Sequence, residues 1–372
     1  MNSKNLVAVT ELRHELHRNP ELSMQETWTK GYLMDFLKLH TTLEIVDKGE
    51  WFYAAYNAGE GKPCVAFRAD FDAIAMDDKI DRPYASKNPG VAHKCGHDGH
   101  SAILVGFAME VDQYGADKNI IFLFQPGEET GEGAMRCLSV FDERKIDEMY
   151  ALHNMPGIPY GAVALKNGTM FCASRGLEMR FMGTSTHASQ PEKGKNPVFA
   201  MAEVTNAIPT IYAPEKYKGL VLCTVVHMEA GEKAFGIAAG EGSLWLTCRG
   251  QFEEEMEAAI NELSTFALST SKKYGITCSF SFSDEFPETS NHKESADKVR
   301  AVCRKMGVPV QEMEMPYRSS EDFGHFLKHT KGAVFLVGMG DGPAIHTVEY
   351  DFSDGIIDRS VELLKALVAL PE

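Results

Sequence analysis

The fold class follows from residues 101–125, which read SAILVGFAMEVDQYGADKNIIFLFQ. Residues 101–114 form an apolar run that Gly115 closes, which predicts a helix. Residues 119–124 form a short apolar run, which predicts a buried strand. Helix and strand patterns alternate on both sides of this stretch, with helices predicted at 6–19 and 27–39 and strands at 51–57, 64–68 and 149–153. This alternation favours an α/β fold with a largely parallel sheet.

The pattern changes after about Gly168. Strands and helices then follow in the order β-α-β-β-α-β, at residues 175–182, 196–212, 220–229, 243–249, 253–274 and 276–283. This order is typical of the ferredoxin-like unit. The sequence therefore predicts a two-domain chain, in which an inserted domain over residues 174–283 interrupts a larger domain formed by residues 1–173 and 284–372.

Composition limits the class of partner. The 372 residues include 37 Lys and Arg against 53 Asp and Glu, a formal net charge of −16. An acidic chain has no general attraction for phosphate backbones or anionic lipid, so neither nucleic acid nor a membrane is expected as a partner. No apolar run approaches the roughly 18 residues that span a bilayer, and residues 1–19 carry charges where a signal peptide is apolar. The eight cysteines are scattered without CxxC pairs, which favours a cytoplasmic protein with reduced thiols.

The densest chemical feature is the segment 93–100, HKCGHDGH. It holds three histidines, one cysteine and one aspartate directly before an apolar helix. Thiolate and imidazole are good ligands for first-row metals, and Cys95 and His97 point the same way if the segment is extended. A polar turn whose histidines cap the helix would explain a single histidine. For the whole cluster, metal binding is the better interpretation.

A second feature, QPGEE at residues 125–129, follows the buried strand predicted at 119–124. Loops at the carboxyl ends of strands are where ligands bind in open α/β sheets. Adjacent acids are common in an acidic chain and can form a solvated loop. Their position after a buried strand favours a division of work, in which one carboxylate binds metal and the other takes a proton from water.

Single histidines and aspartates occupy comparable places. His153 ends a predicted strand, and His346 follows a glycine-rich run. Each alone is more often a structural histidine than a ligand, so their joint occurrence makes them candidates. Asp70 and Asp72 end another strand and either hydrogen-bond ligand imidazoles or form a turn. His187 ends the first strand of the inserted domain, where spacing alone leaves a turn residue and a functional residue equally plausible.

Four motifs occur together in a fixed order, namely HKCGHDGH at 93–100, QPGEE at 125–129, SSEDFG at 319–324 and IHT at 345–347. With LRHELHRNPEL at 12–22, the order resembles the metal-dependent aminoacylase and carboxypeptidase superfamily over nearly the whole chain. The match is to the amidohydrolase branch, which holds hippurate hydrolases, N-acyl-amino-acid deacetylases, N-acetyldiaminopimelate deacetylase and indole-acetyl-amino-acid hydrolases. The CGHD and EE motifs together are specific, whereas either alone would be weak.

The resemblance implies a hydrolase-like, mixed-sheet catalytic domain with an inserted ferredoxin-like lid or dimerisation domain. It also implies two divalent ions per subunit, of zinc, manganese or cobalt. The residues that match the ligand positions of the family are Cys95, His97, Glu129, His153 and His346.

The resemblance further implies that Glu128 is the general base. His187 matches a histidine that stabilises the transition state, often across a dimer interface, so a homodimer or higher homo-oligomer is expected. The implied activity is hydrolysis of N-acetyl or aromatic acyl amino acids by a hydroxide that bridges the two metal ions.

Three alternatives remain at this level. A dipeptidase or carboxypeptidase could use the same two-metal site, because pocket shape cannot be read from the sequence. Cys95 could be a thiol nucleophile with His97 or His100 as its base, and such catalysis would survive a chelator. A binder that keeps the metals without turnover is disfavoured, since it would not need Glu128.

Overall fold

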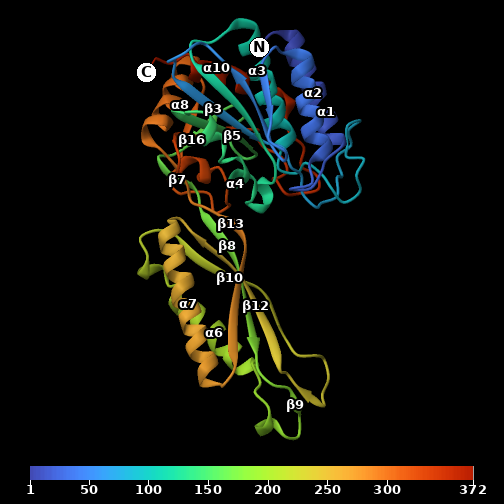
Figure 1. Cartoon of the computed structure of the whole chain (residues 1–372), viewed down its shortest axis with the longest axis vertical. Helices are drawn as coiled ribbons and strands as arrows, with labels where there is room; N and C mark the ends of the chain where they lie inside the picture. Colours follow the sequence, from blue (N-terminus) through green and yellow to red (C-terminus); the bar gives the residue numbers. More distant parts are fainter. Residues whose placement is uncertain (372) are drawn as a thin grey trace. The chain divides into compact units, whose positions relative to one another are not determined.

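The computed structural model describes residues 1–371 and divides into two compact units (Figure 1). Unit 1 comprises Met1–Met170, Thr289–Met315 and the chain from Asp322 onward, and unit 2 comprises Phe171–Glu288 and Pro316–Glu321. Both combine helices with a sheet, which confirms the expected α/β class. Residues 174–283 all lie in unit 2, and their role as a lid or dimerisation domain stays a prediction.

Unit 1 is built on a mixed sheet. Its strands, in spatial order, are β1 (Glu44–Asp47), β2 (Phe52–Tyr56), β4 (Asn119–Gln125), β3 (Cys64–Asp70), β5 (Glu148–Met155), β16 (Lys331–Gly338), β6 (Val163–Leu165) and β15 (Val310–Glu312). The central strands β4, β3, β5 and β16 are parallel, as their apolar runs predict. β1 and β2 join antiparallel at one side, and β6 pairs antiparallel with β16 at the other.

Some helices of unit 1 pack directly on this sheet, and others pack on those helices. α3 (His97–Tyr114) contacts β3, and both α1 (Ser3–Arg18) and α10 (Ile357–Val368) contact α3, while α8 (Lys293–Met306) contacts β16. α4 (Gly133–Cys137) contacts β4, and α9 (Gly324–Leu327) contacts β16. The remaining elements of unit 1 are α2 (Thr27–His40), α5 (Val140–Glu143), a 3₁₀ turn at Glu128–Thr130 and another at Asp354–Ile356, and the paired strands β7 (Gly168–Phe171) and β14 (Thr289–Asn291).

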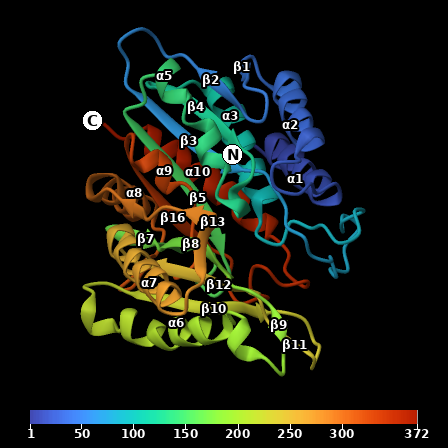
Figure 2. The same cartoon turned by 60° about the horizontal axis from the view of Figure 1, so that its bottom comes forward.

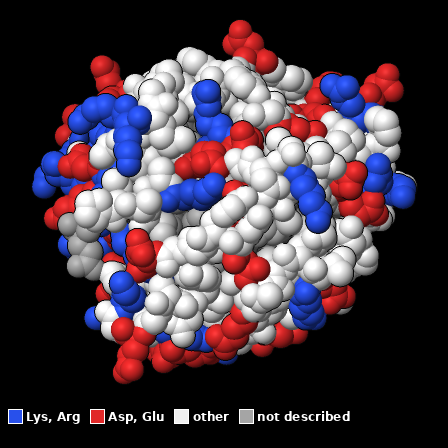
Figure 3. All heavy atoms as spheres, turned by 90° about the horizontal axis from the view of Figure 1, so that it is seen from above, with Lys and Arg blue, Asp and Glu red and all other residues white. Residues whose placement is uncertain are grey.

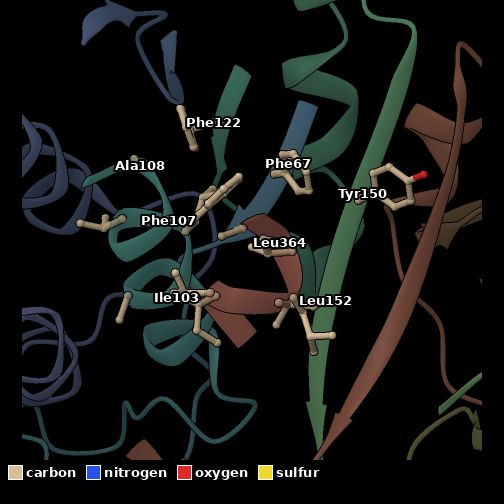
Figure 4. Close-up of a cluster of buried hydrophobic side chains, with 14 of the residues drawn as sticks. Phe67, Ile103, Phe107, Ala108, Phe122, Tyr150, Leu152 and Leu364 are labelled. Carbon is tan, nitrogen blue, oxygen red and sulfur yellow. The ribbon is translucent and has the colours of Figure 1, made fainter. Parts of the chain in front are cut away.

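The core of unit 1 holds α3 firmly against the strands (Figure 4). The Phe67 ring on β3 meets the Phe107 ring on α3 edge-on, with centroids 5.0 Å apart. Phe107 also meets Phe122 on β4 at 5.3 Å, and Leu364 of α10 belongs to the same cluster. Burial of such side chains contributes about 1.5–3 kcal/mol each, so the first turn of α3 is held at the carboxyl edge of the sheet.

Unit 2 has an antiparallel sheet with helices on one face. Its strands, in spatial order, are β10 (Val221–Ala230), β12 (Glu241–Gly250), β8 (Ala173–Met182) and β13 (Thr277–Phe286). α6 (Val198–Ile211) and α7 (Glu253–Lys273) lie side by side on it (Figure 2). The chain order β8-α6-β10-β12-α7-β13 is the predicted ferredoxin-like order. A further pair, β9 (Thr186–His187) with β11 (Ile237–Ala238), was not predicted, because two-residue strands leave no periodic signal.

Two surface findings complete the description. Acidic and basic side chains are interspersed on the face in Figure 3, and lysine and arginine do not gather there into one broad basic area. Within residues 1–371, no helix combines the length and the apolar character needed to cross a membrane.

Candidate metal centre

The candidate site lies at the carboxyl ends of neighbouring parallel strands. Asp70 ends β3, Gln125 ends β4, and His153 lies near the end of β5. Because these strands are parallel and adjacent, their carboxyl ends share one edge of the sheet. α3 begins at the same edge after Gly96, whose backbone is left-handed (φ 99°). A Cβ on Gly96 would lie 2.2 Å from Asn154 Oδ1, so only glycine lets the loop come this close to β5.

Cys95, His97 and His153 form the first donor group. All three are buried, and their donor atoms lie within 4.8 Å of one another. Cys95 Sγ lies 3.3 Å from His153 Nε2. His153 Nδ1 lies 2.6 Å from the backbone oxygen of Asn154, and donating its proton there leaves Nε2 as a free acceptor facing Cys95. A ring whose second nitrogen is fixed in this way is typical of a metal ligand.

His97 is fixed in the same manner. Its Nδ1 lies 3.0 Å from Asp72 Oδ1 and 3.1 Å from the Asp72 backbone oxygen. Its Nε2 is buried and has no hydrogen-bond partner, although carboxylate oxygens of Asp70, Glu129 and Glu128 lie 3.7, 3.8 and 3.9 Å away. A buried nitrogen without a partner is costly, and a cation shared between it and these carboxylates would remove the cost.

Cys95, Glu129 and His346 form a second donor group. His346 Nε2 lies 3.2 Å from Glu129 Oε1, and the His346 side chain is 47% exposed. His346 has a positive φ of 59°, which is uncommon for a residue with a side chain. Its backbone nitrogen donates to the Lys94 oxygen at 2.7 Å, so the strained residue is tied to the loop that carries Cys95. All five predicted ligands therefore come together.

The electrostatics of the site favour positive charge. Burial alone would lower the pKa of His97, but Asp70, Asp72 and Glu129 outweigh it and raise that pKa to about 10. Burial, Glu129 and Glu128 raise the pKa of the Cys95 thiol, so a thiolate needs a cation beside it. This disfavours Cys95 as a metal-free nucleophile. Thiolate, imidazole and carboxylate donors together fit two divalent first-row ions.

A buried ion network holds the ends of the strands in place. The Arg68 guanidinium on β3 donates to Asp70 Oδ2 at 2.6 Å and to Asp322 Oδ1 at 2.8 Å. Gln125 Nε2 donates to both oxygens of Asp322, at 2.9 and 2.8 Å. Sequence reasoning did not assign these roles to Arg68, Gln125 and Asp322, and the signals were the QPGEE and SSEDFG motifs, in which Gln125 and Asp322 lie.

His100, the third histidine of the 93–100 segment, hydrogen-bonds residues that lie next to the donor groups. His100 Nδ1 lies 2.6 Å from Asp70 Oδ1, and His100 Nε2 lies 2.7 Å from Asn154 Oδ1. Both of its nitrogens are therefore engaged by protein atoms. The hydrogen bond from His100 fixes the position of the Asp70 carboxylate, which lies 3.7 Å from His97 Nε2.

Asp98, in the first turn of α3, links that helix to the N-terminal helix α1. It accepts from His17 Nδ1 at 2.8 Å and lies 3.4 Å from the Arg13 guanidinium, and all three side chains are buried. His17 Nε2 also lies 3.2 Å from Asp78. The charges of α1 therefore hold the first turn of α3, which explains why LRHELHRNPEL occurs with the metal-binding motif.

His187 belongs to unit 2, whereas the donor groups belong to unit 1. It does not end the first strand of unit 2 as expected, because β8 ends at Met182 and His187 lies in the separate short strand β9. Its side chain is exposed, and its Nδ1 lies 2.7 Å from Ser189 Oγ. Its role in the transition state stays a prediction.

Comparison with known proteins gives a consistent result. A family model described as Peptidase family M20/M25/M40 matches residues 66–370. The chain is 27% identical to N-acetyldiaminopimelate deacetylases of Limosilactobacillus fermentum and Oenococcus oeni, in each case over 371 residues and 96% of both chains.

Solved structures share the fold. A putative aminohydrolase from methicillin-resistant Staphylococcus aureus superposes with a TM-score of 0.91 at 22% identity, covering 98% of this chain and 96% of that one. A dinuclear metal-binding peptidase from Bacillus subtilis superposes with a TM-score of 0.85 at 21% identity, covering 99% and 98%.

Proposed function

The chain belongs to peptidase family M20/M25/M40, and on that premise we propose that it releases free amino acids from their N-acyl forms. It is a metal-dependent hydrolase. The observation that carries the proposal is the meeting of two donor groups with one further carboxylate, Glu128, beside them. A site that only stored metal would not need this additional carboxylate.

The proposed ligands are Cys95, His97, Glu129, His153 and His346. Zinc, manganese and cobalt suit this mixture of donors. Bound divalent cations supply Lewis acidity that polarises an acyl carbonyl and lowers the pKa of water.

Glu128 is the proposed general base. Its Oε2 lies 3.9 Å from His97 Nε2, which puts its carboxylate at the edge of the donor groups. In this role it takes a proton from the attacking water and then gives it to the leaving amine. Proton transfer by a positioned carboxylate contributes about 10²–10⁴-fold to the rate.

His187 is proposed to stabilise the charge that develops on the acyl oxygen. A donor aimed at such an oxygen contributes about 10²–10³-fold. Neither nitrogen of His187 is held by a buried partner, and the ring is exposed, so it is available to a substrate.

A homodimer or higher homo-oligomer formed through unit 2 is also part of the proposal. β10 is an edge strand of its sheet, and it exposes Val225, Val226 and Met228. Unpaired edge strands with apolar side chains pair readily with another chain. Light scattering should then give at least twice the 41.1 kDa of one chain. A measured mass of one chain at micromolar concentration would contradict the proposed oligomer.

A cytoplasmic location also stays a proposal.

The relatives named N-acetyldiaminopimelate deacetylase support the proposed substrate class. The test is hydrolysis of a panel of N-acetyl amino acids, N-benzoyl amino acids and dipeptides by metal-loaded protein. We expect the N-acyl amino acids to be cleaved fastest. Faster cleavage of dipeptides would favour a dipeptidase instead, and turnover that persists in excess chelator would contradict a metal-dependent site.

A further inference from the structure

Unit 2 holds two cysteines that face each other across neighbouring strands. Cys223 on β10 is directly opposite Cys248 on β12 in the antiparallel register. Their side chains lie on the same face of the sheet, and the two Sγ atoms are 3.9 Å apart. Figure 1 shows the two strands side by side. We propose that this pair is a redox modification site, at which a peroxide forms a reversible disulfide that fastens β10 to β12.

The backbone already meets the main requirement for a disulfide. Directly opposed residues of an antiparallel pair have Cα atoms roughly 4.5–5.5 Å apart, and disulfides accept Cα separations of about 4.4–6.8 Å. Bond formation therefore needs side-chain rotation and a small approach of the strands. Within the chain β10 pairs with β12 alone, and its register shifts between Val225 and His227, shortly after Cys223, which leaves room for this approach.

The two thiols have complementary surroundings. Cys223 is partly exposed, whereas Cys248 is fully buried. The Tyr212 hydroxyl lies 3.2 Å from Cys248 Sγ and can donate to it. The Cys223 thiol, helped by Tyr212, holds the pKa of Cys248 below its ordinary value although burial opposes this. Cys223 is therefore the thiol that an oxidant reaches first, although Cys248 and burial raise the Cys223 pKa, and Cys248 is the better thiolate.

The reaction follows from this difference. The peroxide transfers one oxygen to the Cys223 sulfur, which becomes a sulfenic acid, and one water is released. The Cys248 thiolate then attacks that sulfur, the S–S bond forms, and the hydroxyl leaves as a second water with the proton of the Cys248 thiol. Two thiols are oxidised and one peroxide is reduced to two waters. A dithiol reductant reverses the reaction by thiol–disulfide exchange.

The experiment uses the full-length, metal-loaded protein treated with a small molar excess of hydrogen peroxide. The number of thiols that can be alkylated after denaturation should fall from eight to six, and the intact mass should fall by two hydrogen atoms. Peptide mapping should find Cys223 linked to Cys248 within one chain. Dithiothreitol should restore all eight thiols, and amide hydrogen exchange along β10 should be slower in the oxidised form than in the reduced form.

Matched variants separate this pair from the other cysteines. Cys223→Ser and Cys248→Ser should each abolish the loss of two thiols. Cys278→Ser is the control, because Cys278 is also half-buried in the same sheet but lies opposite Phe181, and it should oxidise like the wild type. A cross-link between two chains, a link to another cysteine, or a Cys223 that stops at the sulfenic or sulfinic acid would each overturn the proposal.

Discussion

Glu128 and Glu129 are adjacent in sequence, yet their surroundings differ. Glu129 lies 3.2 Å from His346 and shares a donor group with Cys95. Glu128 belongs to the group formed with His97 and Glu129, and its carboxylate also lies within 4.8 Å of a carboxylate oxygen of Asp322. The left-handed Gly127 (φ 56°) directly before them opens the 3₁₀ turn in which both lie. This difference is why we assign one carboxylate to metal binding and the other to proton transfer.

Glu128→Gln should separate these two roles. The variant keeps the shape of the side chain but cannot accept the proton, so kcat/KM should fall by at least about 10²–10⁴-fold while metal content stays unchanged. Enzyme kinetics and metal analysis of the same preparation test this. Glu132→Gln is the control, since Glu132 is exposed and pairs with Arg136 in the next turn. A Glu128→Gln enzyme with full activity would mean that the base is misassigned.

At the scale of the element, α3 depends on close approach to its neighbours. A Cβ placed on Gly99, in the first turn of α3, would lie 2.3 Å from the ring of the buried Phe352. Gly31 in α2 has nothing within 4 Å of the same position. Close packing therefore requires glycine at position 99, whereas the space around Gly31 would accept a side chain.

Alanine at these two glycines should have opposite effects on the free energy of unfolding. Gly99→Ala should destabilise the protein by about 1–3 kcal/mol, because Phe352 has to move within a packed core. Gly31→Ala should stabilise it by up to about 1 kcal/mol, because alanine is the better helix former. Urea unfolding of both variants gives the comparison. Equal effects would mean that α3 does not pack as described.

The contact between α1 and α3 should depend on pH through His17. Burial alone would lower the pKa of His17, but Asp98 and Asp78 outweigh it and raise that pKa to about 9. A group with a raised pKa stabilises the fold fully below its unfolded value of about 6.5, and this contribution is lost as the pH rises through about 9.

His17→Gln should therefore be less stable than the wild type near pH 6, by up to roughly 3 kcal/mol, and the difference should shrink near pH 10. Urea unfolding of both proteins at the two pH values measures this. His40→Gln, at the exposed end of α2, should change stability by less than about 0.5 kcal/mol at either pH. A His17 difference that is the same at both pH values would show that His17 is uncharged in the fold.

At the scale of the whole molecule, all five proposed ligands lie in unit 1, and His187 lies in unit 2. Each unit has its own hydrophobic core. A ligand that binds only the folded form stabilises it by about 4 kcal/mol at a thousand times its dissociation constant. Metal binding should therefore act on the stability of unit 1.

Removal of the metal by a chelator should abolish hydrolysis and loosen unit 1 selectively. Hydrogen exchange measured by mass spectrometry should accelerate along α3 and β5, while α6 and α7 in unit 2 should keep their protection. Adding back zinc, manganese or cobalt should restore both activity and protection. An equal loss of protection in both units would contradict a metal site confined to unit 1.

Many of the helices and strands, and the donor residues of the candidate site, could be predicted from the sequence because they depend on local chemistry. The apolar run at 119–124 became β4 with one residue added, and the run at 101–114 became α3, since the side-chain period of an element is written in consecutive residues. α3 begins four residues earlier than predicted, at His97, so the second half of HKCGHDGH forms its first turn instead of preceding the helix. The donors in HKCGHDGH were recognisable because thiolate and imidazole groups are good ligands for first-row metals and several of them lie within eight residues. The short strands β9 and β11 escaped, since two residues carry no period.

What sequence could not supply were the contacts between distant segments. Arg68 reaches Asp322 across 254 positions, and His346 stands beside Glu129. These contacts depend on the spatial order and register of the strands, which no local sequence pattern encodes. Whether a side chain is buried depends on the same order, so the unpartnered Nε2 of His97 and the facing thiols of Cys223 and Cys248 became visible only in three dimensions.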